Sequence, residues 1–459
     1  MNRRSVYVAT LWAAVLSFYA GTAFGQAAQI TGRVADSTGA VIVGAAIAAR
    51  NVDTGIKWEA QSNDVGYYTV PLLPPGRYEM LVRKPGFRAI SRTGIRLDVG
   101  QAARIDFVLE VGPVTESVEV VGDAPLLESE SATMGQVIDN KRIVEMPLNK
   151  RSYLELARLS VGALPASTMG LGARTGGDAG FVAMGSKGYH TTVLLDGVDN
   201  SSRAGGGLLG YQAQIVKPSL DAVAEFKVLT NNFSAEYGYR MGPQVIVSLK
   251  SGTNRLHGSA YEFLRNDKLD GNNFFANRAG RGKAPYRQNQ FGGTIGGPIL
   301  RDKTFFFASY EGTRIRLGNT FLATVASVAA RGGDFSSERL NMNTIFDPLT
   351  TRGAGADAVR QPFPNNVVPK SRFDPVSSRV VELYPLPNIA GREFAANNYF
   401  SSPSTQDDAN QIDFRIDHNF SASDRAFFRY SIRRQERLAP RALPAPALQG
   451  ANRVMPPVD

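Results

Sequence analysis

Three histidines and two neighbouring aspartates are the residues of this sequence that most invite a chemical interpretation. The histidines, His190, His257 and His418, are far apart and fall in different predicted elements, so none forms a metal-binding pair at helical spacing. Asp196 and Asp199 would suit paired carboxylates or a calcium site, but no further oxygen ligands follow in a loop pattern. Aspartate at a turn commonly accepts backbone hydrogen bonds, and this structural interpretation is favoured.

The remaining motifs argue against the common enzyme classes. The 459-residue sequence contains no cysteine, which excludes disulfides, thiolate metal sites and cysteine nucleophiles. No Gly-x-Ser-x-Gly nucleophile motif is present. The glycine-rich stretches Met169–Gly188 and Gly205–Gly207 lack the Gly-Lys-Ser/Thr ending of a phosphate-binding loop. We therefore expect a protein that is not an enzyme, with no catalytic residues, no metal and no cofactor.

The composition is that of a folded, basic protein. Hydrophobic residues make up 43% and charged residues 20%, and the formal net charge is +10. Lysine and arginine are spread along the chain and do not form one basic block. This distribution favours a solvated surface near anionic lipid over a nucleic-acid partner.

The first 25 residues have the three parts of a secretory signal peptide. Arg3 and Arg4 form a short basic region, and the apolar run Val6–Tyr19 follows. Ala23 and Gly25 then supply small residues at the spacing that signal peptidase requires. The run is short for a single-pass anchor, which must cross about 30 Å of hydrocarbon. No later run suits a transmembrane helix, so a membrane role would require β-strands.

Residues 28–111 alternate short apolar strands with turn residues, which predicts a small Ig-like β-sandwich. The expected strands are Ile30–Val34, Ala46–Asn51, Tyr67–Val70, Tyr78–Arg83 and Arg104–Leu109. The motifs at the turns resemble the carboxypeptidase regulatory-like domain, through Asp64–Tyr68, Leu73–Tyr78 and Pro85–Phe87. That fold is also described as carbohydrate-binding-like. Tyr67, Tyr68 and Phe87 could stack on a sugar, but packing in the core or turns is the favoured interpretation.

Residues 112–122 form a linker that contains an extended, alternating run rich in β-branched residues. Such a run can add an edge strand to a partner's sheet, because main-chain hydrogen bonds supply the affinity. The candidate segment consists of Glu116, Ser117, Val118, Glu119, Val120 and Val121. An ordinary connecting strand of a neighbouring domain explains the pattern equally well, so both interpretations stay open.

Residues 123–250 predict a mixed α+β domain. A helix is expected over Ile143–Leu159. The run Thr192–Asp199 reads as a buried strand that ends in an Asp-Gly turn. Leu220–Thr230 supplies a further long apolar run.

Residues 251–459 predict membrane-spanning β-strands. In 411–420, polar and apolar residues alternate with His418 as the exception. In 425–432, one face carries Ala426, Phe428, Tyr430 and Ile432, and the other carries Arg425, Arg429 and Ser431. Such a pattern suits lipid outside and water inside, while a soluble sandwich is the alternative.

Three earlier candidate strands are Leu256–Asn266, Tyr286–Gly297 and Thr304–Thr313. The connections between the five candidates alternate long and short: 267–285, 298–303, 314–410 and 421–424. Long external and short internal connections alternate in outer-membrane barrels. The pattern therefore predicts the beginning of an antiparallel transmembrane β-barrel.

Several motifs closely resemble Oar-like TonB-dependent outer-membrane receptors. They are Ser251–Asn254, His257–Asn266, Gln290–Pro298, Phe305–Phe307, Asp347–Thr350 and Tyr384–Asn388. The resemblance implies that residues 123–250 are a plug domain, called the predicted plug below. It implies that residues 251–459 are the first strands of a barrel. It also implies that Glu116–Val121 is a TonB box, the segment that pairs with a TonB-like periplasmic energy-coupling protein.

The expected function is therefore uptake of an unidentified extracellular substrate across the outer membrane of a Gram-negative-type bacterium. The alternative is a surface-binding or adhesion protein, with possible carbohydrate binding and without active transport. Plugged transporters close with about 22 strands. About five are expected here, so we expect the chain to be a fragment, with lipid at its wall and unable to form a stable barrel alone.

Overall fold

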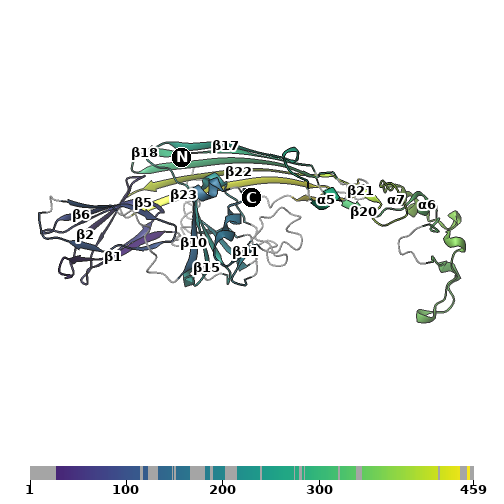
Figure 1. The fold of residues 1–459 in the computed structure, drawn as a ribbon, viewed down its shortest axis with the longest axis horizontal. Helices are drawn as coiled ribbons and strands as arrows, with labels where there is room; N and C mark the ends of the chain where they lie inside the picture. Colours follow the sequence, from purple (N-terminus) through teal and green to yellow (C-terminus); the bar gives the residue numbers. More distant parts are fainter. Residues whose placement is uncertain are drawn as a thin grey trace, which may run out of the picture. The chain divides into compact units, whose positions relative to one another are not determined.

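The computed structural model is mainly β (Figure 1). It describes residues 27–113, 117–121, 133–146, 148, 151–165, 181–186, 190–201, 214–237, 240–272, 274–278, 282–283, 285–318, 321–337, 344–421, 424–444 and 452–454. The predicted signal peptide lies outside the described residues, as does Glu116 of the candidate TonB box.

Two sheets form the N-terminal sandwich. The first has the order β4-β1-β7, with β8 also paired to β1, and the second has the order β3-β2-β5-β6-β9. The strands are β1 Ala28–Asp36, β2 Ala46–Asn51, β3 Lys57–Gln61, β4 Tyr67–Leu73, β5 Gly76–Arg83, β6 Ala89–Leu97, β7 Ala102–Arg104, β8 Phe107–Leu109 and β9 Ser117–Val121.

The sandwich core follows from the alternation of its strands. Buried residues of both sheets pack into one cluster that includes Trp58, Tyr68 and Tyr78. The ring centroids of Trp58 and Tyr78 lie 5.7 Å apart in an edge-on arrangement. The Tyr68 hydroxyl donates a 2.6 Å hydrogen bond to the Ile105 carbonyl. Buried tyrosines thus satisfy their polar ends while they fill the core.

Each strand expected in the sandwich is present, with one modification. The expected strand Arg104–Leu109 is divided into β7 and β8, which both pair with β1 in parallel. The sequence pattern missed β3 and β6. Lys57–Gln61 is mostly polar, and the apolar residues of Ala89–Leu97 do not alternate regularly.

The predicted plug contains one five-stranded sheet in the order β10-β15-β16-β13-β14 and a separate pair, β11-β12. Its core is built from the apolar residues of β13, β15 and β16, with Tyr153 and Phe181 packed against them. The strands are β10 Met134–Asp139, β11 Ala163–Pro165, β12 Phe181–Ala183, β13 Thr192–Leu195, β14 Val198–Asp199, β15 Val223–Asn231 and β16 Gln244–Leu249.

The single helix expected over Ile143–Leu159 is wrong. The structure has a short α2 (Asn140–Glu145) and a separate 3₁₀ helix η2 (Tyr153–Leu159). Pro147 lies between them in the sequence and cannot donate the helical hydrogen bond. The shorter 3₁₀ helices are η4 (Leu220–Ala222) and η5 (Ala235–Tyr237).

Long strands that follow residue 250 form one sheet in the order β17-β18-β19-β22-β23-β24, open among the described residues (Figure 1). We call the first five the strand wall. The strands are β17 His257–Asn266, β18 Tyr286–Leu300, β19 Thr304–Gly318, β22 Ser404–Asn419, β23 Arg425–Ala439 and β24 Asn452–Val454. The predicted alternation of long and short connections is confirmed.

Four of the five wall strands are longer than expected. β18, β19 and β23 each have 15 residues and β22 has 16, whereas a tilted membrane strand needs about 9–11. The sequence pattern located only their most regular parts. The additional residues include charged pairs such as Arg316 with Asp408, which continue the ladder where apolar alternation has ended.

The connection between β19 and β22 carries structure of its own. β20 (Phe321–Ala323) pairs with β21 (Tyr399–Ser401) in an antiparallel ladder. The fully buried Asn398 side chain exchanges two 2.8 Å hydrogen bonds with the backbone of Val325. The helices here are α6 Val328–Arg331, η7 Pro348–Thr350, η8 Gly355–Asp357, η9 Pro364–Asn366, η10 Lys370–Arg372 and α7 Pro375–Glu382.

The connection between β17 and β18 contains η6 (Asp267–Leu269) and α5 (Phe274–Arg278). Among the described residues, no helix is both long enough and apolar enough to cross a membrane.

One close approach in the sandwich yields a prediction. A Cβ at Gly32 would lie 1.8 Å from the Ile105 carbonyl oxygen, a backbone atom that cannot rotate away. We expect Gly32→Ala to destabilise a fragment of residues 28–121, which includes β9 and Gly112, by about 3 kcal/mol. Urea unfolding followed through Trp58 fluorescence measures this. Gly112→Ala is the matched control, because its Cβ meets only the flexible Arg88 side chain. Equal stability of the two variants would contradict the prediction.

Candidate functional site

The turn between β13 and β14 places a carboxylate in the interior. Asp196 and Gly197 both have positive φ, 48° and 82°, as the type I′ hairpin turn requires. Asp196 tolerates this conformation because its short side chain bonds to nearby backbone. Its Oδ1 accepts a 3.0 Å hydrogen bond from the Leu249 amide, and only 3% of its side chain is exposed. The predicted Asp-Gly turn is therefore confirmed.

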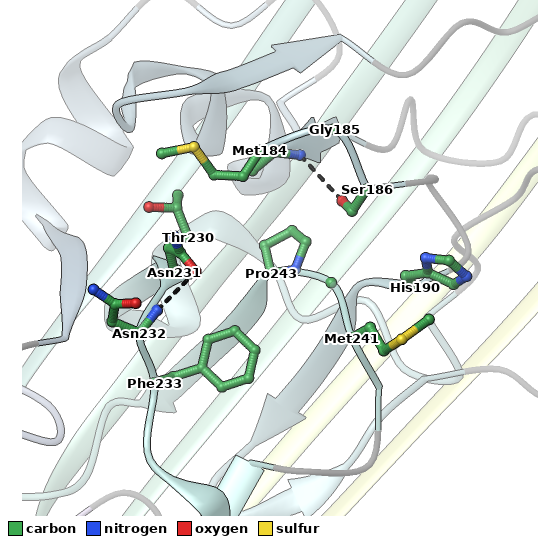
Figure 2. Close-up of a pocket in the computed structure, with 12 residues that line it drawn as sticks. Met184, Gly185, Ser186, His190, Thr230, Asn231, Asn232, Phe233, Met241 and Pro243 are labelled. Carbon is green, nitrogen blue, oxygen red and sulfur yellow. Dashed lines mark hydrogen bonds between the residues drawn. The ribbon is translucent and has the colours of Figure 1, made fainter.

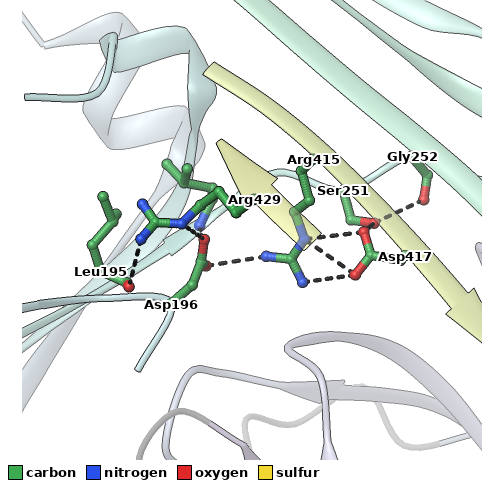
Figure 3. A network of polar contacts seen from close by, with 8 residues as sticks. Leu195, Asp196, Ser251, Gly252, Arg415, Asp417 and Arg429 are labelled. Carbon is green, nitrogen blue, oxygen red and sulfur yellow. Dashed lines mark hydrogen bonds and ion pairs between the residues drawn. The ribbon is translucent and has the colours of Figure 1, made fainter. Parts of the chain in front are cut away.

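Two arginines of the strand wall face this carboxylate (Figure 3). Arg415 of β22 donates a 3.1 Å hydrogen bond from Nη1 to Asp196 Oδ1. Arg429 of β23 places Nε 3.5 Å from Asp196 Oδ2, which is an ion pair with poor hydrogen-bond geometry. Both guanidinium groups are largely buried, with 14% and 16% of the side chain exposed.

A second carboxylate completes the network. Asp417 lies two residues after Arg415 on the same face of β22 and accepts a 2.8 Å hydrogen bond from its Nη2. Ser251, the first residue after the predicted plug, donates a 2.6 Å hydrogen bond to Asp417 Oδ2. Two carboxylates thus lie beside two guanidinium groups in a largely buried site (Figure 3), and the buried Asp413 also interacts electrostatically with Arg429.

The opposite face of the same strands is apolar and exposed. Ile412, Phe428 and Tyr430 are 46%, 57% and 53% exposed, whereas Gln411 and Asp413 are 1% exposed. This inversion of the usual soluble pattern, with apolar residues outside and polar residues inside, is the arrangement of a lipid-facing wall. It confirms the alternation predicted for residues 411–420 and 425–432. Phe427 is an exception on the polar face, where the Arg415 guanidinium lies 4.7 Å from its ring centroid.

Another buried carboxylate connects the sandwich with the predicted plug. Glu225 of β15 is 5% exposed and accepts a hydrogen bond from the Val99 amide. Its second oxygen lies 3.8 Å from Arg96 of β6. Burial, with a smaller contribution from the Asp98 carboxylate, raises the pKa of Glu225 to about 7. The contact between these segments therefore contains a group that titrates near neutral pH.

The residues with potential chemistry are not brought together. Asp199 Oδ1 accepts a 2.9 Å hydrogen bond from the Ser201 amide, a local turn role. His257 contacts the Arg255 carbonyl at 3.0 Å, and His418 contacts the Thr304 hydroxyl at 2.8 Å. Among the described residues, no group of three or more His, Cys, Asp or Glu side chains could hold a metal ion.

His190 lies in a hollow of the predicted plug with a volume of about 510 Å³ (Figure 2). Its described lining carries no carboxylate, lysine or arginine. Met184, Phe233 and Met241 make part of the wall apolar, and asparagine and serine side chains supply polar groups. The described lining residues therefore do not form a set of charged side chains arranged to bind an ion.

The three aromatic residues considered for sugar stacking lie in different environments. Tyr68 belongs to the sandwich core, Tyr67 is 46% exposed and Phe87 is partly buried.

Ser117–Val121 of the candidate TonB box forms β9, which pairs in parallel with β6 of the sandwich. The sequence pattern predicted neither Arg415 nor Arg429 as the partner of Asp196. Their placement on the polar face of the strands was the available signal.

Comparison with known proteins agrees with this architecture. The outer membrane beta barrel domain family matches residues 248–455, and the carboxypeptidase regulatory-like domain family matches residues 29–110. The TonB-dependent transporter Oar of Myxococcus xanthus is 28% identical over 337 residues, which cover 70% of this chain and 30% of that protein. The chain is a homologue of this TonB-dependent transporter. The resemblance and the mainly β fold class predicted from the sequence are confirmed.

Solved structures with lower similarity include the ferric enterobactin receptor of Pseudomonas aeruginosa. It is 14% identical, with 68% of this chain and 34% of that chain covered and a TM-score of 0.38. The outer membrane transporter YddB of Escherichia coli is 10% identical, with 67% and 34% covered and a TM-score of 0.40. The chain thus spans about a third of the length of these relatives.

The Asp196 network yields a stability prediction. Asp196→Asn keeps the turn and the acceptor for the Leu249 amide, but it removes the charge that offsets Arg415 and Arg429. Removing one partner of a buried pair costs about 3 kcal/mol. We expect local opening of β13 and β16 to become easier by that amount, measured by hydrogen exchange of their amides.

The matched control is Glu79→Gln, which breaks the exposed 2.8 Å pair between Glu79 and Arg50. Its expected cost is at most about 1 kcal/mol. Wild-type exchange in the Asp196→Asn protein would show that the buried pairs do not hold the predicted plug.

The Glu225 contact yields a pH prediction. Its pKa in the folded chain, about 7, lies above the ordinary value of 4.5. The folded contact therefore binds the proton more tightly, is strongest below pH 4.5, and weakens as the pH rises through 7. The full change in the free energy of the folded contact across this pH range is on the order of 3 kcal/mol. Hydrogen exchange of the Val99 amide, corrected for its intrinsic rate, measures it between pH 5 and 8. Glu225→Gln should remove the dependence, and a pH-independent wild-type contact would contradict the assignment.

Proposed function

We propose that this protein serves as a TonB-dependent outer-membrane transporter for an unidentified substrate. The strand wall spans the outer membrane, the predicted plug closes its interior, and Glu116–Val121 binds a TonB-like periplasmic energy-coupling protein. A signal peptide cleaved near Gly25 delivers the chain to the envelope. The protein is not an enzyme in this proposal.

One observation carries the proposal. Asp196 of the predicted plug is buried against Arg415 and Arg429 of strands whose opposite face is apolar and exposed. A buried carboxylate held by two guanidinium groups fixes a domain inside a wall, yet a force of sufficient size can break such pairs one at a time. An adhesion protein needs no interior domain held in this way.

The similarity to the transporter of Myxococcus xanthus supports the same class. It leaves the substrate open. A surface-binding protein without transport remains the second candidate, because the connection between β19 and β22 has its own strand pair and helices. Transport requires the energy-coupling partner and surface binding does not, so dependence on that partner distinguishes the two functions.

Deletion of residues 116–121 tests the proposal in the source bacterium. We expect uptake to be lost, because the partner has no strand to pair with, while the outer-membrane level and surface binding stay unchanged. Uptake is measured as depletion of medium components by mass spectrometry, relative to a strain that lacks the gene. Copurification with the periplasmic domain of the coupling protein should also be lost.

The matched control replaces Glu116 and Glu119 by glutamine. It leaves the main chain of the segment intact, so uptake should be retained. Unchanged uptake after the deletion would refute the coupling assignment and favour the surface-binding alternative.

A further inference from the structure

The outer part of the second sandwich sheet is built from β6 and β9. β6 pairs with β5 on one edge and with β9 on the other. The parallel register with β9 runs from Ala89 opposite Ser117 to Thr93 opposite Val121. It stops where Gly94 takes a φ of +77°. The five residue pairs thus include every described residue of the candidate TonB box, and on β6 they end at Thr93.

The chain just before β9 is fixed beside the start of β6. The Arg88 amide donates a 2.8 Å hydrogen bond to the Glu110 carbonyl, and the Gly112 amide donates a 3.1 Å hydrogen bond to the Gly86 carbonyl. Phe87 and Val111 form an antiparallel bridge between the same segments. Residues 113–116 alone separate this anchor from β9.

A short tether has a quantitative consequence. It converts pairing of β9 with β6 into an intramolecular event with an effective concentration in the millimolar range. A separate protein in the periplasm must compete against that value. Without β9, the main-chain groups of β6 would form an open sheet edge, which natural proteins usually cover.

The position of β9 also matters for any pulling force. The register of β9 with β6 is parallel, so tension along β9 loads its five residue pairs together. A force applied to residues 117–121 while they are paired would act on the sandwich.

We propose that the β6 edge of the sandwich is a binding site in cis for the coupling segment, and that the energy-coupling partner engages residues 117–121 only after their release from β6. This inference rests on the proposed function. The carboxypeptidase regulatory-like domain then controls access to the coupling segment. The expected ligand of the β6 edge is an extended segment of this same chain, recognised through its main chain.

Cysteine cross-linking of the full chain tests this proposal, because the sequence contains no cysteine of its own. Ile90→Cys with Val118→Cys places two thiols on residues that are opposite each other in the register. A short thiol-specific cross-linker should join them in cells that express the protein. Tyr67→Cys with Val118→Cys is the matched control, since Tyr67 lies in the other sheet, and it should remain unjoined.

Binding of the purified periplasmic domain of the coupling protein is then compared before and after cross-linking. The closed Ile90–Val118 pair should weaken binding about tenfold or more, because the competent state is no longer populated. The uncross-linked protein should bind. Hydrogen exchange should also be slow at the amides of residues 117–121 in the unmodified chain.

Two results would overturn the inference: undiminished binding by the cross-linked protein, or fast exchange and failure to cross-link. A different result separates it from the proposed function. If the pair cross-links and the amides are protected, but no form of the protein binds the periplasmic domain, the coupling assignment fails. The strand-binding role of the β6 edge is then supported by itself.

Discussion

The rest of the structure depends on one buried negative charge. An isolated carboxylate in a dry interior is strongly unfavourable, so Asp196 is stable there only with Arg415 and Arg429 beside it. The arginines in turn gain from a carboxylate, because both side chains are largely buried where they face the predicted plug. The carboxylate of the predicted plug and the guanidinium groups of β22 and β23 therefore offset each other's cost of burial. This mutual dependence joins the predicted plug to β22 and β23.

Features that depend only on neighbouring residues could be predicted from the sequence. The Asp196–Gly197 turn needs only two residues, and the alternation along β22 and β23 needs only the period of a strand. Both appear in the structure at the expected positions. The helix expected over Ile143–Leu159 is wrong, because α2 and η2 are separate helices and Pro147 lies between them in the sequence.

Long-range pairing was not predictable in the same way. Arg415 is more than two hundred residues from Asp196, and nothing in a single sequence states which of many charges will meet. Ser117–Val121 shows the same limit. Its pattern specified an extended segment that can join a sheet, but any sheet edge satisfies that pattern. Only the fold shows the β6 edge as its position, and only the fold shows Glu225 in contact with Val99.

The connection between β19 and β22 has a consequence for evolution. Asn398 and the β20–β21 pair close this segment on itself through its own hydrogen bonds, so its internal order does not rely on the wall ladder. Sequence between those two anchor points is free to diverge, lengthen or be exchanged while the strands on either side keep their register. Variation within this segment is thereby uncoupled from the pairing of β19 with β22 in the strand wall.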